Sequence, residues 1–295
     1  MEITAKKATS IGLIAIVLWS AIVGLIRSVS EGLGAIGGAA MIYSLASLVL
    51  LLTLGFPKVK TFPRAYLITG SLLFVCYELC LSLSLGFAST GTQAIEVGMV
   101  NYLWPGMTIL LSVIVTRQRC SLLIIPGMLV SIAGICLVLA GDRAFSFSEI
   151  AASVASNPLS YGLAFSGAAI WAIYCVVTKK IANGSNGITL FFILTALTLW
   201  VKFLAAPQPE MVFTLRVGVN LLLGAMAMGF GYAAWNIGIL HGHVTLLATA
   251  SYFIPVISAM LAAVMLNASL SVSFWQGAAM VSLGSLLCWW STRQR

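Results

Sequence analysis

The stretch NYLWP, residues 101–105, lies in the middle of an apolar run from about residue 94 to about residue 116, long enough to cross a bilayer as a helix. Pro105 has no backbone N–H, so in a helix it frees the carbonyl of Asn101. In hydrocarbon a freed carbonyl must find a partner in protein, water or ligand. Helical spacing puts Asn101, Trp104 and Pro105 on one face, with Tyr102 at its flank. We expect a kinked membrane helix whose polar face looks inward.

The same arrangement returns 150 residues later, where Tyr252, Phe253 and Ile254 precede Pro255. A kinked helix at corresponding positions of both halves is typical of the central site of a transporter built from repeats. The alternative is a pair of structural kinks whose freed carbonyls are satisfied by neighbouring helices. The repetition favours a binding site.

The composition predicts an integral membrane protein. Charged residues make up 7% of the chain and hydrophobic residues 61%, against about 25% and about 45–50% in soluble domains. The net charge of +8 is scattered between apolar runs, so it indicates membrane topology and no nucleic-acid partner. The first run is too long for a signal peptide and is expected to be retained. Ten membrane-spanning helices are predicted at residues 11–27, 35–55, 65–86, 94–116, 121–140, 160–181, 188–204, 217–240, 244–266 and 274–292.

Basic residues and repeated landmarks set the expected topology. Most of the 15 Lys and Arg residues fall on the cytoplasmic side if the N-terminus is cytoplasmic, and an even number of spans returns the C-terminus to that side. Tyr102 and Tyr252 are 150 residues apart, and Trp19 and Trp171 are 152 apart. With five spans per repeat, the second copy must enter the membrane from the other side. The predicted fold is all-α, with two inverted five-helix repeats, residues 1–141 and 142–295, in one membrane domain.

Glycine pairs mark the last helix of each repeat. Gly127 and Gly134 lie seven residues apart in the fifth span, and Gly277 and Gly284 repeat the spacing in the tenth. Small residues on one stripe let helix backbones approach closely in lipid. We interpret both stripes as scaffold or dimer contacts.

A carboxylate interrupts the third predicted span. Phe74, Tyr77, Glu78 and Leu81 share one helical face near mid-membrane. Because a charge at a helix centre costs about 2.5–3.5 kcal/mol on insertion scales, Glu78 is a candidate partner for a substrate ammonium or a proton carrier. A structural carboxylate, protonated or hydrogen-bonded to a neighbouring helix, is the alternative. Glu96 lies nearer the end of its span, where a vestibule or structural role is expected.

Aromatic and amide side chains on several spans predict a cavity that stacks a flat ring or a cation. Aromatic residues at helix ends, such as Trp275, Trp289 and Trp290, instead fit an interfacial belt. The candidate substrate-binding or pore residues are Trp19, Tyr77, Glu78, Asn101, Tyr102, Trp104, Pro105, Trp171, Tyr174, Tyr232, Trp235, Asn236, Tyr252 and Pro255.

Enzyme and metal signatures are missing from the sequence. It contains no G-x-S-x-G, H-E-x-x-H or P-loop motif, so neither a hydrolase nor an ATPase is expected, and no cofactor. His241 and His243 form a poor metal motif, and the six cysteines show no metal spacing and no disulfide framework. The expected partners are a small-molecule substrate and membrane lipid; the oligomeric state stays open, a monomer included.

Several runs resemble the drug/metabolite transporter superfamily of the EamA type, and within it the bacterial inner-membrane exporters of aromatic amino acids. They are GLIAIVLWS (12–20), VSEGLG (29–34), AIEVGMVNYLWP (94–105), PLSYGLAF (158–165), PQPEM (207–211) and YAAWNIGILHG (232–242).

The resemblance implies export of Phe, Tyr and Trp from the cytoplasm by alternating access through a central cavity. A broader exporter of other metabolites or of flat cations such as paraquat is the alternative. Small multidrug pumps of the superfamily exchange protons through a glutamate in the first helix, where this chain has Trp19 and Ser20. The driving force therefore stays open. Two alternatives come from other classes of protein. A membrane enzyme acting on lipid is disfavoured because the sequence shows no clustered catalytic residues. A structural or sensory membrane protein is disfavoured because it would not need kinked helices at matching positions of both halves.

Overall fold

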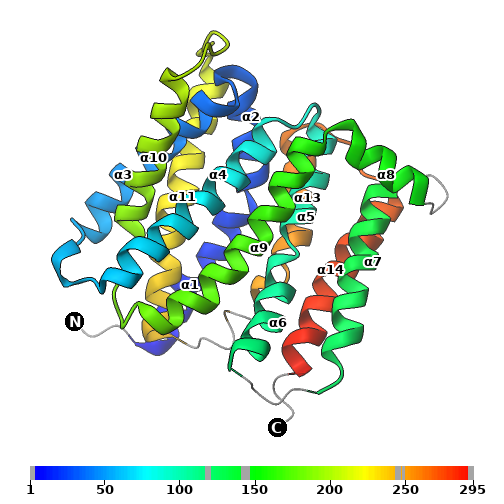
Figure 1. Ribbon diagram of the computed structural model, residues 1–295. Coiled ribbons are helices and arrows are strands. Elements are labelled where there is room, and N and C mark those ends of the chain that lie inside the picture. Colours follow the sequence, from blue (N-terminus) through cyan, green and yellow to red (C-terminus); the bar gives the residue numbers. More distant parts are fainter. Residues whose placement is uncertain (1–3, 117–120, 141–146, 243–246, 248–249, 292–295) are drawn as a thin grey trace.

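The computed structural model describes residues 4–116, 121–140, 147–242, 247 and 250–291, and these residues form helices without any β-strand (Figure 1). The elements are α1 (Ala5–Ser20), α2 (Ile22–Leu33), α3 (Ala35–Leu54), the 3₁₀ turn η1 (Val59–Thr61), the π-helical turn η2 (Tyr66–Gly70), α4 (Ser71–Gly86), α5 (Gly91–Asn101), α6 (Trp104–Thr116), α7 (Ile124–Ala140), α8 (Phe147–Ser156), α9 (Pro158–Ile181), α10 (Ile188–Leu204), α11 (Leu215–His241), α13 (Ile254–Met265) and α14 (Val272–Ser291).

Long apolar helices make this a multi-pass membrane protein. Within the described residues, 6 helical stretches are long and apolar enough to cross a membrane. The pair α1 and α2, bent by 40°, raises the number to 7 if it counts as one span. Three shorter apolar helices, α7, α10 and α13, accompany them. The predicted all-helical membrane class is confirmed.

The predicted helix breaks are confirmed at both prolines. Helix α5 ends at Asn101, and α6 begins at Trp104 after a turn at residues 102–103. In the second half a turn at residues 252–253 precedes α13, which begins at Ile254. Pro105 and Pro255 therefore occupy the first turns of the helices that follow, where a missing N–H costs no intrahelical hydrogen bond.

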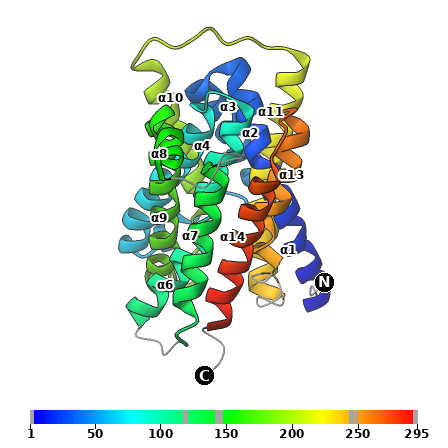
Figure 2. The same cartoon turned by 90° about the vertical axis from the view of Figure 1, so that its right-hand side faces the viewer.

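Two helix pairs flank the molecule. Helices α7 and α14 run side by side through their glycine stripes, so these glycines make scaffold contacts within one chain (Figure 2). Helices α3 and α10 pack together on the other side (Figure 1). Between the two pairs lie α1, α2, α4, α5, α6, α9, α11 and α13. Helix α1 begins, and α14 ends, at the same end of the molecule.

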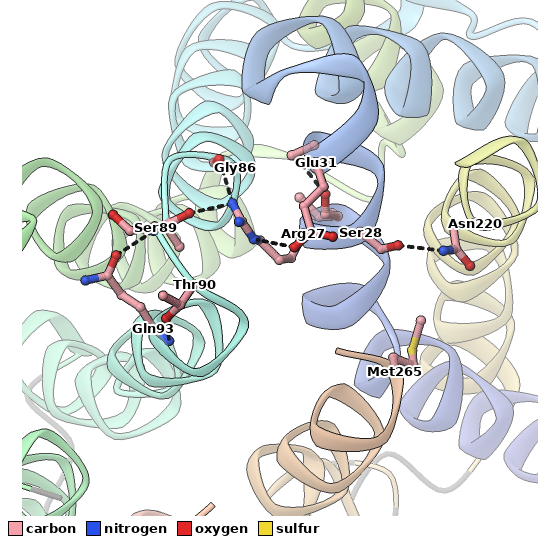
Figure 3. A network of polar contacts seen from close by, with 12 residues as sticks. Arg27, Ser28, Glu31, Gly86, Ser89, Thr90, Gln93, Asn220 and Met265 are labelled. Carbon is pink, nitrogen blue, oxygen red and sulfur yellow. Dashed lines mark hydrogen bonds and ion pairs between the residues drawn. The ribbon is translucent and has the colours of Figure 1, made fainter. Parts of the chain in front are cut away.

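Polar contacts join helices at the opposite end (Figure 3). The Arg27 guanidinium on α2 donates to the carbonyl oxygens of Gly86 and Ala88, just where α4 ends, and its Nε lies 3.3 Å from a carboxylate oxygen of Glu31. A cation at a helix C-terminus also complements the helix dipole. Asn220 of α11 donates to the Ser28 hydroxyl on α2 across 2.6 Å. Helix α2 is thus tied to both α4 and α11.

Candidate substrate cavity

A cavity of about 180 Å³ lies among the helices between the two flanking pairs. Its wall is mainly apolar and aromatic, and it receives residues from α1, α2, α4, α5, α6, α9, α11 and α13. The turn after α5 adds Tyr102. The lining residues are Trp19, Ile22, Val23, Tyr77, Leu81, Gly98, Asn101, Tyr102, Trp104, Trp171, Cys175, Met228, Tyr232, Trp235 and Ile254.

Aromatic rings form two groups in and around this wall. In the first, Trp171 stacks on Tyr174 at 4.8 Å and 14°, and Tyr77 lies 4.4 Å from Trp171. In the second, Trp19 lies 5.0 Å from Tyr232 and 5.2 Å from Trp235. These separations are those of favourable aromatic pairs. Tyr232 links the groups, because its ring is also 6.4 Å from that of Trp171.

Eight of the fourteen candidate residues lie in the wall: Trp19, Tyr77, Asn101, Tyr102, Trp104, Trp171, Tyr232 and Trp235. Five described candidates do not. Tyr174 lies behind Trp171, Tyr252 packs 6.5 Å from the Trp289 ring, and Pro105 and Pro255 are buried in the first turns of their helices. Glu78 is the fifth. Asn236 belongs to α11, but its side chain lies outside the described part of the structure.

Glu78 has no exposed surface and lies behind the wall. Its Oε2 accepts a hydrogen bond from the Tyr43 hydroxyl at 2.5 Å, and its Oε1 accepts one from the Tyr232 hydroxyl at 2.8 Å. Ser82, one turn along α4, donates to the Tyr43 oxygen at 3.0 Å. Both carboxylate oxygens therefore have donors from other helices, as a buried carboxylate requires.

The second intramembrane carboxylate has a separate partner. Glu96 on α5 accepts a hydrogen bond from the Tyr161 hydroxyl on α9 at 2.6 Å. It does not line the cavity. This contact joins α5 to α9 and leaves Glu96 without a place in the aromatic wall.

Except for Leu81, which shares the predicted face of Tyr77, the sequence did not point to the apolar part of the wall, nor to Tyr43 as the partner of Glu78. One signal was available for two lining residues. Cys175 follows Trp171 by four positions on one face of α9, and Val23 follows Trp19 by the same spacing across the bend between α1 and α2. Ile254 likewise occupies the position in α13 that Trp104 has in α6. No comparable signal marks Tyr43, because its role depends on how α3 packs beside α4.

Metal ligation finds no support in the described residues. They contain no group of three or more His, Cys, Asp or Glu side chains that could hold a metal ion. His243 and Cys120 lie outside the described residues. The described cysteines are free thiols: Cys76, Cys80, Cys136, Cys175 and Cys288. Of these five, Cys175 lines the cavity.

A solved structure shares the fold. A chain described as "Crystal structure of protein" is 24% identical to this one and superposes with a TM-score of 0.69. The match covers 98% of this chain and 99% of that one.

Apolar helices around a mainly aromatic cavity are the arrangement expected of a multi-pass membrane transporter. Residues 158–290 match the EamA-like transporter family. Two proteins named aromatic amino acid exporter YddG are each 59% identical to this chain. The one from Salmonella typhimurium (strain 14028s / SGSC 2262) matches over 99% of this chain and 100% of its own length. The one from Escherichia coli (strain K12) matches over 99% of each chain. The chain therefore belongs to the family of these exporters, within the EamA-like transporters.

A third relative of the same name, from Ancylobacter novellus, is 32% identical over 56% of each chain. Family membership confirms the resemblance and places the chain among transporters, not enzymes. It also identifies a multi-pass protein of the bacterial inner membrane.

Proposed function

We propose that this chain exports Phe, Tyr and Trp across the inner membrane through its central cavity. The observation that carries the proposal is the pair of aromatic groups around Trp171 and Trp19, which line a mostly apolar space. Flat apolar side chains gain both burial and ring contacts in such a space. The names of the two relatives at 59% identity support the same substrate class.

The wall favours a zwitterion over a cation. None of its lining residues is charged, and both oxygens of Glu78 are already hydrogen-bonded. A permanent cation would have to leave water for aromatic faces alone, whereas the two charges of an amino acid partly compensate each other. Export of flat cations is thus the weaker alternative.

Two polar atoms of wall residues fit the amino acid backbone. Asn101 is 4% exposed, and no hydrogen bond reaches its Oδ1, which can accept from an ammonium group. The Trp19 indole N–H, which can donate to a carboxylate, is also buried without a partner. Such groups carry a desolvation cost until a ligand pairs with them. Both atoms are enclosed in this conformation, and the Trp19 Nε1 lies against Gly231. We therefore propose Asn101 and Trp19 as contacts for the α-amino and carboxylate groups that form only when their side chains turn toward the cavity as the substrate is seated.

For the membrane topology we propose ten spans in two inverted repeats, residues 1–141 and 142–295, with both termini cytoplasmic. Helix pairing supports this arrangement. In the expected order of spans, α1 pairs with α11 as the first with the eighth, and α9 pairs with α4 as the sixth with the third. The repeat relates the first span to the sixth and the third to the eighth, so each of these two pairs is the counterpart of the other. A topology test with periplasmic and cytoplasmic reporters fused after His241 and at the C-terminus should give a cytoplasmic signal at both sites.

For alternating access we propose a role for the helix breaks at Pro105 and Pro255. Each break lies beside wall residues, Tyr102 in the first half and Ile254 in the second. We propose that the repeats rock about these breaks. In this proposal the contacts of Arg27 with the end of α4 close the periplasmic side.

The direct test is transport of radiolabelled Phe into proteoliposomes by wall variants. Trp104→Ala, Trp171→Ala and Tyr77→Ala should each lower kcat/KM at least about tenfold, because burial of an aromatic ring contributes about 1.5–3 kcal/mol. Trp290→Ala is the matched control, since Trp290 is 57% exposed on α14 and does not line the cavity. Unchanged transport in all three wall variants would refute the aromatic cavity.

A counterflow assay with the twenty amino acids tests the substrate class itself. Liposomes loaded with unlabelled Phe, Tyr or Trp should take up labelled Phe faster than liposomes loaded with any other amino acid. Equal stimulation by aliphatic amino acids would favour the broader metabolite exporter.

A further inference from the structure

We propose that Glu78 is a positioning residue: it holds the ring of Tyr232 in the cavity wall and does not touch the substrate. This inference rests on the proposed function, because the wall that Tyr232 helps to form is the proposed substrate site. It gives a transport role to a buried carboxylate that has no surface in the cavity.

Tyr232 occupies a central place among the rings. Its ring lines the cavity, while its hydroxyl donates to Glu78 behind the wall. Trp19 packs on it at 5.0 Å, Phe192 at 5.1 Å and Phe74 at 5.9 Å. A shift of the Tyr232 ring would therefore change the wall on the side of Trp19 and on the side of Trp171, 6.4 Å away.

The hydrogen bond between Glu78 and Tyr232 also joins the two halves of the chain. Glu78 lies on α4 and Tyr232 on α11, 154 residues apart. The other carboxylate oxygen is held by Tyr43 on α3, which packs against α10 in one of the flanking pairs. Glu78 thus connects a flanking helix to a ring of the cavity wall, and the Tyr43 contact fixes the direction in which its second oxygen points.

The geometry separates positioning from two other roles. A substrate ammonium would have to displace Tyr232 to reach Glu78, since the side chain has no exposed surface. A proton carrier needs a group that ionises, which glutamine cannot replace. A positioning residue needs only the hydrogen bonds, and a glutamine amide can accept from Tyr232 and donate to the Tyr43 oxygen. Glu78→Gln therefore discriminates between the roles.

The first experiment measures KM and kcat for Phe in proteoliposomes. Glu78→Leu removes the acceptor of the Tyr232 hydrogen bond while keeping a similar side-chain volume. It should raise KM about 3- to 10-fold, because one or two buried hydrogen bonds contribute a free energy of that size. The change in kcat should be smaller. Tyr232→Phe, which keeps the ring, should raise KM to a similar extent. The double variant should be no worse than the worse single one, because both remove the same contact. Glu78→Gln should stay within about threefold of the wild type.

The second experiment needs no substrate. Cys175 shares the cavity wall with Tyr232, so a loosened ring should change how fast a small thiol reagent modifies it. Glu78→Leu and Tyr232→Phe should each speed the labelling of Cys175 at least about threefold, and Glu78→Gln should not. Subtracting the signal of the same variants carrying Cys175→Ser removes labelling of the other thiols.

These outcomes distinguish the two proposals. A wild-type protein that labels as expected but does not transport Phe refutes the proposed function and leaves the positioning role standing. Glu78→Gln as impaired as Glu78→Leu in both experiments, or Glu78→Leu unchanged in both, overturns the positioning role. Additive effects of Glu78→Leu and Tyr232→Phe would overturn it as well. If Glu78→Leu fails to fold, the KM and the Cys175 labelling rate of Tyr232→Phe test the positioning role without it.

Discussion

Gly134 on α7 and Gly277 on α14 approach each other so closely that a Cβ atom added to Gly134 would lie 2.6 Å from the Gly277 carbonyl oxygen, and one added to Gly277 would lie 2.5 Å from the Gly134 carbonyl oxygen. Real Cβ atoms essentially never come this near to backbone oxygen. The two backbones are therefore in direct contact, without a side chain between them. In lipid, where burial of apolar surface gives no drive for helix association, such packing has to hold helices together.

Gly134→Ala should accordingly lower thermal stability in detergent. The added methyl group forces α7 and α14 apart, and overpacking of this kind costs about 1–3 kcal/mol. Gly162→Ala is the matched control, because a Cβ at Gly162 would meet nothing within 4 Å. Equal melting temperatures for both variants, measured by tryptophan fluorescence, would show that the glycine contact contributes nothing.

Cys175 should report on substrate in the cavity. Its side chain lies in the wall beside Trp171 and Tyr232, whereas Cys288 is buried elsewhere on α14. Modification with a bulky thiol reagent should abolish most Phe transport, and saturating Phe should slow the modification about tenfold by occupying the same space. Cys175→Ser should transport Phe and resist the reagent. Inhibition that persists in Cys175→Ser would assign the effect to another thiol.

Removal of the Arg27 contacts should open the cavity more often at the end of the molecule that we propose to be periplasmic. Arg27 donates to the carbonyl oxygens of Gly86 and Ala88, and a hydrogen bond to a charged group contributes about 1.5–3 kcal/mol when buried. Arg27→Ala should therefore raise the rate at which a membrane-impermeant thiol reagent, added outside intact cells, reaches Cys175 by about tenfold or more. Arg216→Ala is a control, since the exposed Arg216 hydrogen bond to the Met265 carbonyl oxygen joins α11 to α13 and does not involve α4. Equal rates in the wild type and in Arg27→Ala would show that the Arg27 contacts do not limit access to the cavity.

Replacement of Pro105 should lower the transport rate without lowering the amount of folded protein in the membrane. Pro105→Ala restores a backbone N–H that lets the helix continue through residues 102 and 103, which moves Trp104 out of its place in the wall. We expect kcat for Phe to fall several-fold while membrane expression stays at the wild-type level. Pro126→Ala is the control, because Pro126 lies in the first turn of α7, which does not line the cavity. Similar kinetics for both variants would argue against a functional break at Pro105.

Local sequence patterns predicted most of the fold and much of the cavity wall. Apolar run length predicted membrane helices, because the bilayer thickness sets how many apolar residues a span needs. Pro105 and Pro255 predicted the two breaks, since a proline cannot donate the hydrogen bond of a continuous helix. Helical spacing around Trp104, Trp171 and Trp235 predicted lining residues, because residues three and four apart share a face.

Contacts between distant helices lay beyond those patterns. Spacing placed Glu78 on a face with Tyr77 and Leu81, both of which line the cavity, but could not show that Tyr232 stands between the carboxylate and the cavity. Nor could it reveal Tyr43 as the second donor or tell whether the glycine stripes meet within one chain. The sequence alone therefore determined most of the membrane helices, the breaks at Pro105 and Pro255 and which faces are aromatic, because these depend on neighbours along the chain. It did not predict the 40° bend between α1 and α2, which lies inside the single span expected at residues 11–27. Only the tertiary structure decided which side chains face the cavity and which are buried behind it, because that depends on hydrogen bonds and packing between different helices, 35 residues apart for Tyr43 and Glu78 and 154 apart for Glu78 and Tyr232.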